Sequence, residues 1–249
     1  MNQKQIEKTI EQFYGFLDGD DNKHRYRSWE HCFNAFNEIF NKQEILNEND
    51  LDYLSLHLGF YLASWGMYRG SSFLLRDYDY TIHKECVKIL FEYKDLLKKD
   101  IFGLDKVDCL NLLFERDCLY DKLWNYYKNL NTKTKKVSTT LITKIIMGTL
   151  GCSPAYDRFF NIALSKFKIK KTKKGKPNIE ALIEFVNKNT GFQKAFNNKL
   201  KEITSKRQVN YTKMKILDMF FWQYGKDNYK SDLKTQDILS FAKKVSPNL

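Results

Sequence analysis

The sequence predicts an all-α fold, a compact multi-helix body that is either undivided or split into two lobes around a cleft. Only three prolines occur in 249 residues, so few positions prevent helix formation. Apolar residues recur every three or four positions over long stretches, which is the period of a helix face packed on a core. A hydrophobic content of 43% is typical of a packed globule. We therefore expect one helical domain over residues 1–249, long enough to bury a substantial core.

The first half of the chain predicts five helices, each with one apolar face. The first is marked by the apolar stripe Ile6, Ile10, Phe13, Phe16 and Leu17. A polar break over residues 19–23 follows, and Ser28 is expected to cap the second helix, because its hydroxyl can accept a hydrogen bond from the first turn. Three further helices are predicted over residues 51–65, 81–99 and 108–130.

The second half predicts a run of shorter helices. A central helix over 139–150 is followed by one over 154–167, with Pro154 in its first turn, where a missing N–H does no harm. The remaining helices are predicted over 178–188, 190–205, 211–224 and 232–243. Asn178 is expected to cap the first of these, and Gly225 to end the strongly apolar helix before it.

The charge balance favours a polyanionic partner. Lys and Arg number 42 against 30 Asp and Glu, which gives a net charge of +12. The five cysteines form no C-x-x-C pair, and the four histidines lack metal-ligand spacing, so we expect neither a disulfide framework nor a bound metal, and no cofactor. The first residues are polar, and no apolar run approaches the roughly 18 residues of a membrane span. A cytoplasmic protein without membrane contact is expected; the oligomeric state stays open.

The segment from Val137 to Phe160 is the most informative stretch. A lysine-rich turn (Lys133, Lys135 and Lys136) leads into Ser and Thr residues that can cap a helix. The free N–H groups at such a helix start bind phosphate. An apolar run follows, is interrupted by Gly151 and Pro154, and is succeeded by Asp157. This order indicates a phosphate grip at a fixed distance from one carboxylate; the alternative is an ordinary acid that caps the next helix.

A hairpin, an apolar helix and then Pro-x-x-Asp together resemble the central segment of the helix-hairpin-helix DNA glycosylases. The resemblance covers about 30 residues. It implies that Lys133, Lys135, Lys136 and the backbone at Ser138 hold DNA phosphate. It also implies that Asp157 stabilises the positive sugar as a modified base departs, in repair or in defence against phage. DNA is then the expected partner rather than RNA.

Three departures from that family qualify the prediction. The hairpin, residues 131–138, contains no glycine. Strand-cutting members carry a lysine where Ser138 stands, so the resemblance implies base removal without lyase activity. No cysteines are spaced for an iron–sulfur cluster.

Two more segments fit DNA handling. Glycosylases extrude the target nucleotide and fill the gap that it leaves. Residues suited to this task, as plug or as stacking wall, are Trp65, Tyr68, Arg69, Phe73 and Tyr156. The basic run over residues 166–176 supplies Lys170, Lys171, Lys173 and Lys174 as further DNA contacts. The alternatives are that the aromatic residues belong to the core and that the lysines form a solvated face.

Two other functions remain open at this stage. Arg25 stands six positions before His31 in Arg-Tyr-Arg-Ser-Trp-Glu-His, which resembles the Arg–His motif of HEPN ribonucleases. There the histidine acts in acid–base chemistry on the RNA 2′-hydroxyl, and the arginine holds the phosphate. The third hypothesis is a basic helical module that binds nucleic acid or a protein without catalysis.

Overall fold

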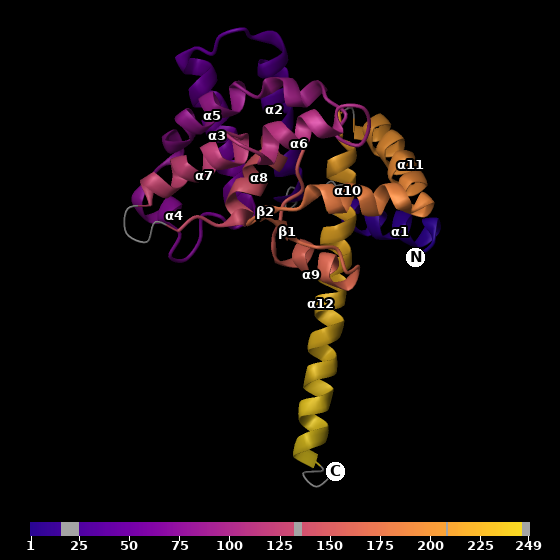
Figure 1. The fold of residues 1–249 in the computed structure, drawn as a ribbon. Coiled ribbons are helices and arrows are strands. Elements are labelled where there is room, and N and C mark those ends of the chain that lie inside the picture. The colour runs from indigo at the N-terminus through magenta and orange to yellow at the C-terminus, as the bar shows by residue number, and fades with distance from the viewer. Residues whose placement is uncertain (16–24, 132–135, 208, 246–249) are drawn as a thin grey trace.

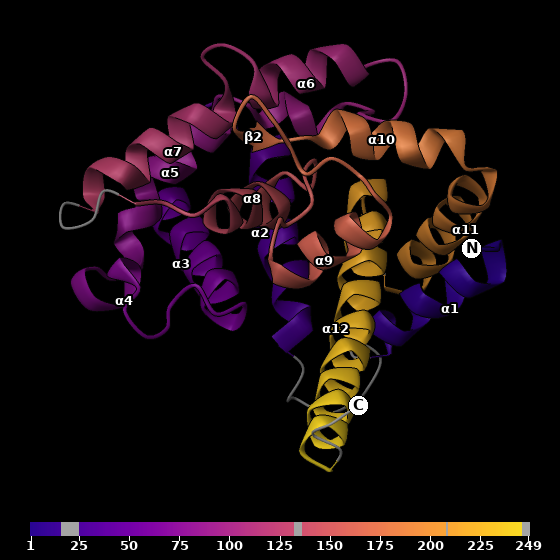
Figure 2. The same ribbon diagram turned by 60° about the horizontal axis from the view of Figure 1, so that its bottom comes forward.

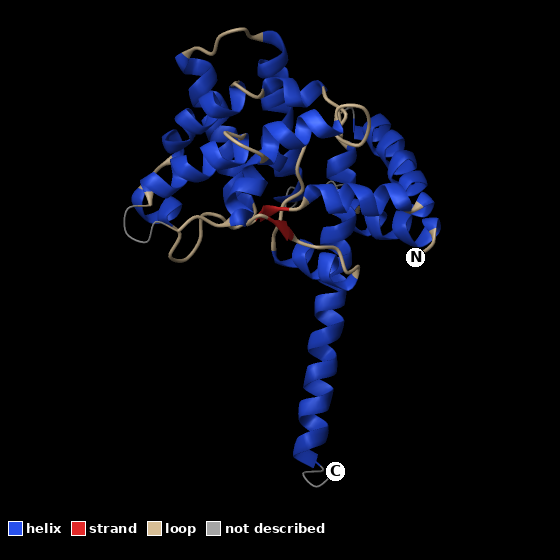
Figure 3. Ribbon diagram, in the orientation of Figure 1, coloured by secondary structure: helices blue, strands red, loops and turns tan. Residues whose placement is uncertain are grey.

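The computed structural model describes residues 1–15, 25–131, 136–207 and 209–245. The described chain is mostly helical, and its sheet is a single two-stranded hairpin (Figure 3). The elements of the first half are α1 (Gln3–Tyr14), η1 (Arg25–Arg27), α2 (Ser28–Lys42), α3 (Glu48–Ser64), α4 (Phe73–Asp77), η2 (Tyr80–Ile82), α5 (His83–Phe91), η3 (Lys94–Lys98), α6 (Lys106–Phe114) and α7 (Leu119–Leu130). Those of the second half are α8 (Thr139–Thr149), α9 (Arg158–Lys166), β1 (Thr172–Lys173), β2 (Lys176–Pro177), α10 (Ile179–Lys188), α11 (Thr190–Arg207) and α12 (Lys213–Val245).

The helices pack as two groups. In the first group α2 and α3 pack on each other and on α8. Helix α5 packs on α3 and α7, and α7 also packs on α6 and α8. In the second group α12 packs against α1, α9 and α11, and α10 packs on α11. Figure 2 shows α1 beside α12, although they lie at opposite ends of the chain. The first and last helices are thus brought together, and the central segment joins the two groups.

Helix α8 is buried on nearly every side. All residues from Leu141 to Thr149 are buried, which explains why its sequence is apolar around the whole helix rather than along one stripe. Gly148 makes this packing possible: a β-carbon there would stand 2.3 Å from a ring carbon of Tyr61 on α3. The position of α8 is therefore fixed by close backbone approach as well as by apolar burial.

Several sequence predictions of element boundaries are confirmed. The central helix begins and ends where expected, and the side chain of Asn178 caps α10 by accepting a hydrogen bond from the Ala181 N–H at 3.2 Å.

No helix within the described residues has both the length and the apolar character to cross a membrane. All five cysteines are buried free thiols, and the described residues contain no group of three side chains placed to hold a metal ion.

Other boundaries were predicted wrongly. Ser28 is the first residue of α2, and the preceding Arg27 occupies the cap position without a side-chain bond. The stretch 81–99 is divided among η2, α5 and η3. The stretch 108–130 is divided between α6 and α7, because Asp117 between them has a φ of +54°, which a right-handed helix cannot contain. Pro154 lies in a loop, and α9 begins only after Asp157.

Gly225 does not end the apolar helix as predicted. Helix α12 runs through it to Val245, and in Figure 1 its far end projects away from the helical body. A β-carbon at Gly225 would stand 1.8 Å from the carbonyl oxygen of Phe159. The glycine is therefore the point where α9 lies directly against α12, and its lack of a side chain serves packing rather than helix termination.

Candidate active site at the junction of the two helix groups

The loop between α8 and α9 folds back along α8. Gly151 allows the reversal, because it has a φ of +62° and a β-carbon there would stand 2.8 Å from Phe33. The hydroxyl of Thr140 donates to the carbonyl oxygen of Tyr156 at 2.9 Å, and the Tyr156 N–H donates to the hydroxyl of Thr143 at 3.0 Å. These bonds place the next residue, Asp157, beside the first half of α8.

Three hydrogen bonds hold the carboxylate of Asp157. One oxygen accepts the N–H of Phe160 at 3.2 Å, so Asp157 is the N-terminal cap of α9. The other oxygen accepts Nζ of Lys144 at 3.2 Å and the indole N–H of Trp222 at 3.1 Å. The side chain of Asp157 is 15% exposed, whereas that of its partner Lys144 is 3% exposed. The acid is thus a helix cap and also the partner of a buried lysine from the other helix group.

A second buried ion pair lies nearby on α12. Nζ of Lys215 is 3.2 Å from a carboxylate oxygen of Asp218, and the two side chains are 4% and 8% exposed. The other oxygen of Asp218 accepts the N–H of Ala155 at 3.0 Å, in the same loop that carries Asp157. Burial lowers the pKa of the Lys215 ammonium, and the positive charge of Lys144 lowers it further. The two lysines are therefore electrostatic neighbours.

Aromatic rings surround these charges. The ammonium of Lys144 lies 4.7 Å from the ring centre of Trp65, and that of Lys215 lies 5.0 Å from the ring centre of Trp29. The rings of Trp65 and Trp222 meet edge to face at 5.8 Å. Six residues meet here from the end of α3, from α8, from the start of α9 and from α12. We call them the junction cluster: Trp65, Lys144, Asp157, Lys215, Asp218 and Trp222.

The start of α8 opens into a basic cavity of about 340 Å³. Its lining includes Arg69 from the loop after α3, together with Lys136 and Ser138 from the turn before α8. Ser138 caps α8 by accepting the N–H of Leu141 at 3.1 Å. The structure thus brings Lys136 and Ser138 together with Arg69 and Phe73, two predicted nucleotide-handling residues from the segment after α3. Lys133 and Lys135 lie outside the described residues.

The residues predicted to handle an extruded nucleotide lie in different environments. Trp65 is half-buried in the junction cluster, and Arg69 is exposed. The half-buried hydroxyl of Tyr68 is 2.7 Å from Nε2 of His83. Phe73 is 8% exposed and lines the basic cavity together with Arg69, whereas Tyr156 is buried in the core at 3% exposure. We therefore assign a core role to Tyr156, and keep Trp65, Arg69 and Phe73 as candidates for nucleotide contact.

The basic run over residues 166–176 also divides into two parts. Lys170 and Lys171 are exposed. Lys173, by contrast, pairs with Glu180, and Nζ of Lys174 lies 3.8 Å from a carboxylate oxygen of Glu115. Part of the positive charge of this run is thus offset by acids of the protein itself.

The residues of the ribonuclease hypothesis lie on the first helix group. His31 is exposed on α2. Burial lowers the pKa of His57 on α3, and a positive charge on His31 lowers it further, so the two histidines are neighbours. Arg25 belongs to η1, but its side chain lies outside the described residues.

Sequence reasoning missed Lys144, Lys215, Asp218 and Trp222. The apolar pattern predicts their helices but not their contacts. A usable signal exists, because Lys144 stands within Leu-Ile-Thr-Lys-Ile-Ile-Met and Asp218 within Ile-Leu-Asp-Met-Phe-Phe. A charged side chain within such an apolar run must be paired when the helix is buried. Searches with family models and with curated proteins found no match for this chain, and no solved structure matched it.

Proposed function

We propose that this protein binds DNA and is a monofunctional DNA glycosylase, with Asp157 as the catalytic carboxylate. One observation carries the proposal: Asp157 is fixed by three hydrogen bonds and is the most exposed of the four charged groups in the junction cluster. It lies beside the helix whose N-terminal turn faces the basic cavity. An acid beside a helix start with cationic neighbours supports the proposed pairing of a carboxylate with a phosphate grip.

The chemistry needs a carboxylate held in place. Breaking an N-glycosidic bond leaves an oxocarbenium-like sugar, and a fixed negative charge beside it stabilises the transition state. Asp157 supplies that charge, and the same carboxylate can orient the attacking water. Lys144 and Trp222 hold it from one side and the Phe160 N–H from the other, so little reorganisation is required during the reaction.

DNA contact is proposed at the start of α8. Arg69, Lys136 and the capped helix start at Ser138 would hold phosphate, with Lys133, Lys135, Lys170 and Lys171 as further cationic contacts. Lys144, the lysine that binds Asp157, follows Ser138 by six positions, which is about 9 Å along a helix axis at about 1.5 Å per residue. Phosphate and sugar could therefore be held by successive turns of one helix.

The proposal keeps base removal without strand cleavage. Cleavage by an amine requires a lysine that reaches the sugar. The helix start carries Ser138 instead, and the amine of Lys144 is buried and bonded to Asp157. The product is then an intact strand with an abasic site. A modified base as substrate, in repair or in defence against phage, remains part of the proposal.

The test is excision from duplex DNA that carries methylated, oxidised, deaminated or hydroxymethylated bases. Alkali and heat then break the strand wherever an abasic site has formed. Asp157→Asn should retain DNA binding and the cap on α9 but lose excision by at least about 100-fold. Asp79→Asn, at the exposed cap of η2, controls for the loss of a cap carboxylate, and Asp218→Asn controls for the loss of the acid beside a buried lysine. All three variants are assayed below their own unfolding temperature, and the two controls should still excise the base.

Other outcomes would reassign the protein. Unchanged excision by Asp157→Asn removes Asp157 from the mechanism. RNA cleavage that is lost in His31→Ala would favour the ribonuclease. Salt-sensitive DNA binding with neither product would indicate a non-catalytic module.

A further inference from the structure

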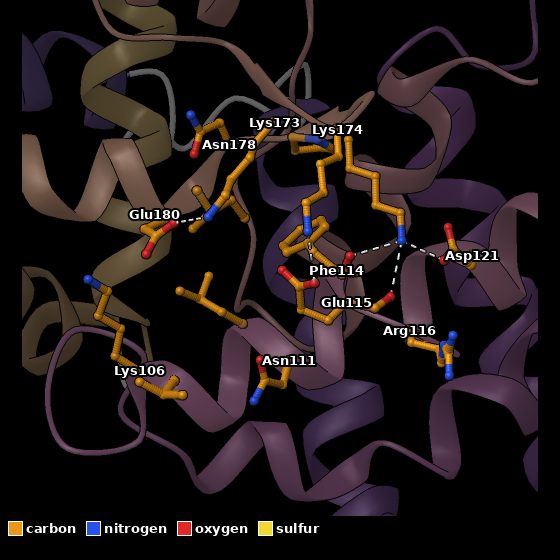
Figure 4. Close-up of a pocket in the computed structure, with 15 residues that line it drawn as sticks. Lys106, Asn111, Phe114, Glu115, Arg116, Asp121, Lys173, Lys174, Asn178 and Glu180 are labelled. Carbon is orange, nitrogen blue, oxygen red and sulfur yellow. Dashed lines mark hydrogen bonds and ion pairs between the residues drawn. The ribbon is translucent and has the colours of Figure 1, made fainter.

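A cavity of about 390 Å³ lies between α6, the hairpin β1–β2 and the start of α10 (Figure 4). None of its lining residues belongs to the junction cluster or to the basic cavity at the start of α8. The proposed function therefore leaves it unassigned. Its volume lies within the range of about 300–1,000 Å³ that is usual for small-molecule sites.

Part of the cavity lining is apolar. Leu110 and Phe114 of α6 line it together with Pro177 and Ile179, and Val107 stands at the mouth with 69% of its surface exposed. These side chains come from elements about 70 residues apart in the chain. Such a surface suits a flat apolar ring, which gains by leaving water.

More than half of the lining residues are charged, with cations in excess. Five basic residues line the cavity, namely Lys106, Arg116, Lys173, Lys174 and Lys176; three acidic residues do so, namely Glu115, Asp121 and Glu180, which leaves +2 (5 − 3). Each acid is already engaged by one lysine of the hairpin. Lys106 and Arg116 supply the excess charge, and it favours an anion.

The wall that carries the lysines is held in a defined geometry. Nζ of Lys176 donates to the carbonyl oxygens of Phe114 at 2.9 Å and Glu115 at 3.1 Å, and it also pairs with Asp121. The hairpin turns through Lys174 and Gly175, both with positive φ, as a two-residue turn of the primed type requires. A lysine at such a position is unusual, and here it directs its side chain to the cavity.

We propose that this cavity binds a small organic anion, a flat apolar ring that carries a phosphate or a carboxylate. The ring lies on Leu110 and Phe114, and the anionic group meets Lys174. Lys106 and Arg116 lie at opposite ends of the cavity in Figure 4, so they add positive potential rather than a shared contact. Lys174 is available because its pair with Glu115 is long, at 3.8 Å, and the two side chains are 77% and 50% exposed. Such a pair is worth little, so an anion replaces Glu115 at small cost.

Calorimetric titration with five compounds tests the proposal. 1-Naphthyl phosphate and 1-naphthoate carry the same flat ring with different anions, whereas 1-naphthol, inorganic phosphate and acetate each offer one half. Binding of at least one combined compound, about 10-fold tighter than either of its halves, is the expected result. Because the ring is the same, the tighter of the two combined compounds shows whether the site prefers phosphate or carboxylate. No binding of either at millimolar concentration would overturn the proposal.

Variants locate the site. Val107→Trp blocks the mouth from an exposed position and should abolish binding without affecting folding; Leu110→Trp fills the floor and should do the same. Lys174→Met should weaken binding about 5- to 10-fold. Lys128→Met, on an exposed position of α7 outside the cavity, should leave it unchanged. Undiminished binding in Val107→Trp would refute the site, whatever the excision assay shows.

Discussion

The junction cluster and the cavity beside α6 both pair lysines with carboxylates, but they differ in how much water reaches the charges. In the junction cluster the paired side chains are 3–15% exposed, and every carboxylate accepts a further N–H. In the cavity beside α6 the pair Lys174–Glu115 is 77% and 50% exposed. Buried charges must be paired because desolvation costs several kcal/mol, whereas exposed pairs contribute about 0–1 kcal/mol. The ion pairs of the junction cluster are therefore fixed in geometry, whereas Lys174 in the cavity can leave Glu115 for an anionic ligand.

The largest expected effect comes from breaking a buried pair. Lys215→Met leaves the buried carboxylate of Asp218 with only the Ala155 N–H, and should lower the free energy of unfolding by about 3–5 kcal/mol. Lys174→Met, the matched change in the exposed pair, should cost less than about 0.5 kcal/mol. Urea unfolding of both variants measures the difference; equal effects would remove the distinction between the two places.

An intermediate effect is expected from pH. Burial lowers the pKa of His83 to about 3 from a usual value of 6.5. Between those values the unfolded chain binds a proton that the folded protein does not, so stability is complete above about pH 6.5 and falls as the pH drops. The slope is about 1.4 kcal/mol per pH unit for one such group, or about 2 kcal/mol by pH 5.

Urea unfolding from pH 7 to pH 5 tests this dependence. His83→Gln should flatten most of the slope, while His57→Gln should leave most of it, because His57 is only half-buried. The carboxyl of Glu30 has a pKa lowered from 4.5, so its contribution appears at lower pH. An unchanged slope in His83→Gln would show that another group is responsible.

The smallest effect concerns the turn of the hairpin. Gly175 has a φ of +78° in open space, so Gly175→Ala meets no atom and suffers only backbone strain, about 1 kcal/mol. Gly15→Ala is the control, since Gly15 has a helical φ of −54° and the substitution should be neutral or slightly stabilising. Thermal unfolding distinguishes them, and a neutral Gly175→Ala would mean that the turn geometry is not needed.

The helical character was predictable because apolar period and scarce proline act locally. Boundaries failed where packing decided the outcome. Gly225 reads as a stop signal, yet it serves the contact of α9 with α12, and only the fold reveals Phe159 beside it. Asp117 divides a predicted helix through its positive φ, which no residue pattern marks.

The sequence predicts some residues of the candidate site but not the side chains that bind Asp157. Asp157 and Ser138 were found because caps and turn residues carry local signals. Lys144 and Trp222 come from helices read as apolar core, and their bonds to Asp157 span 13 and 65 positions. Partners at such separations depend on the tertiary arrangement, so single-sequence reasoning could not pair them.

Mass spectrometry of bases released from DNA tests the central claim most directly, because it detects the product and identifies the substrate at once. Incubation of the protein with DNA that carries a panel of modified bases should release one kind of free base. Asp157→Asn, at equal DNA occupancy, should release none above background. No free base with the unaltered protein, or equal release with the variant, would contradict the assignment of Asp157 as a catalytic carboxylate.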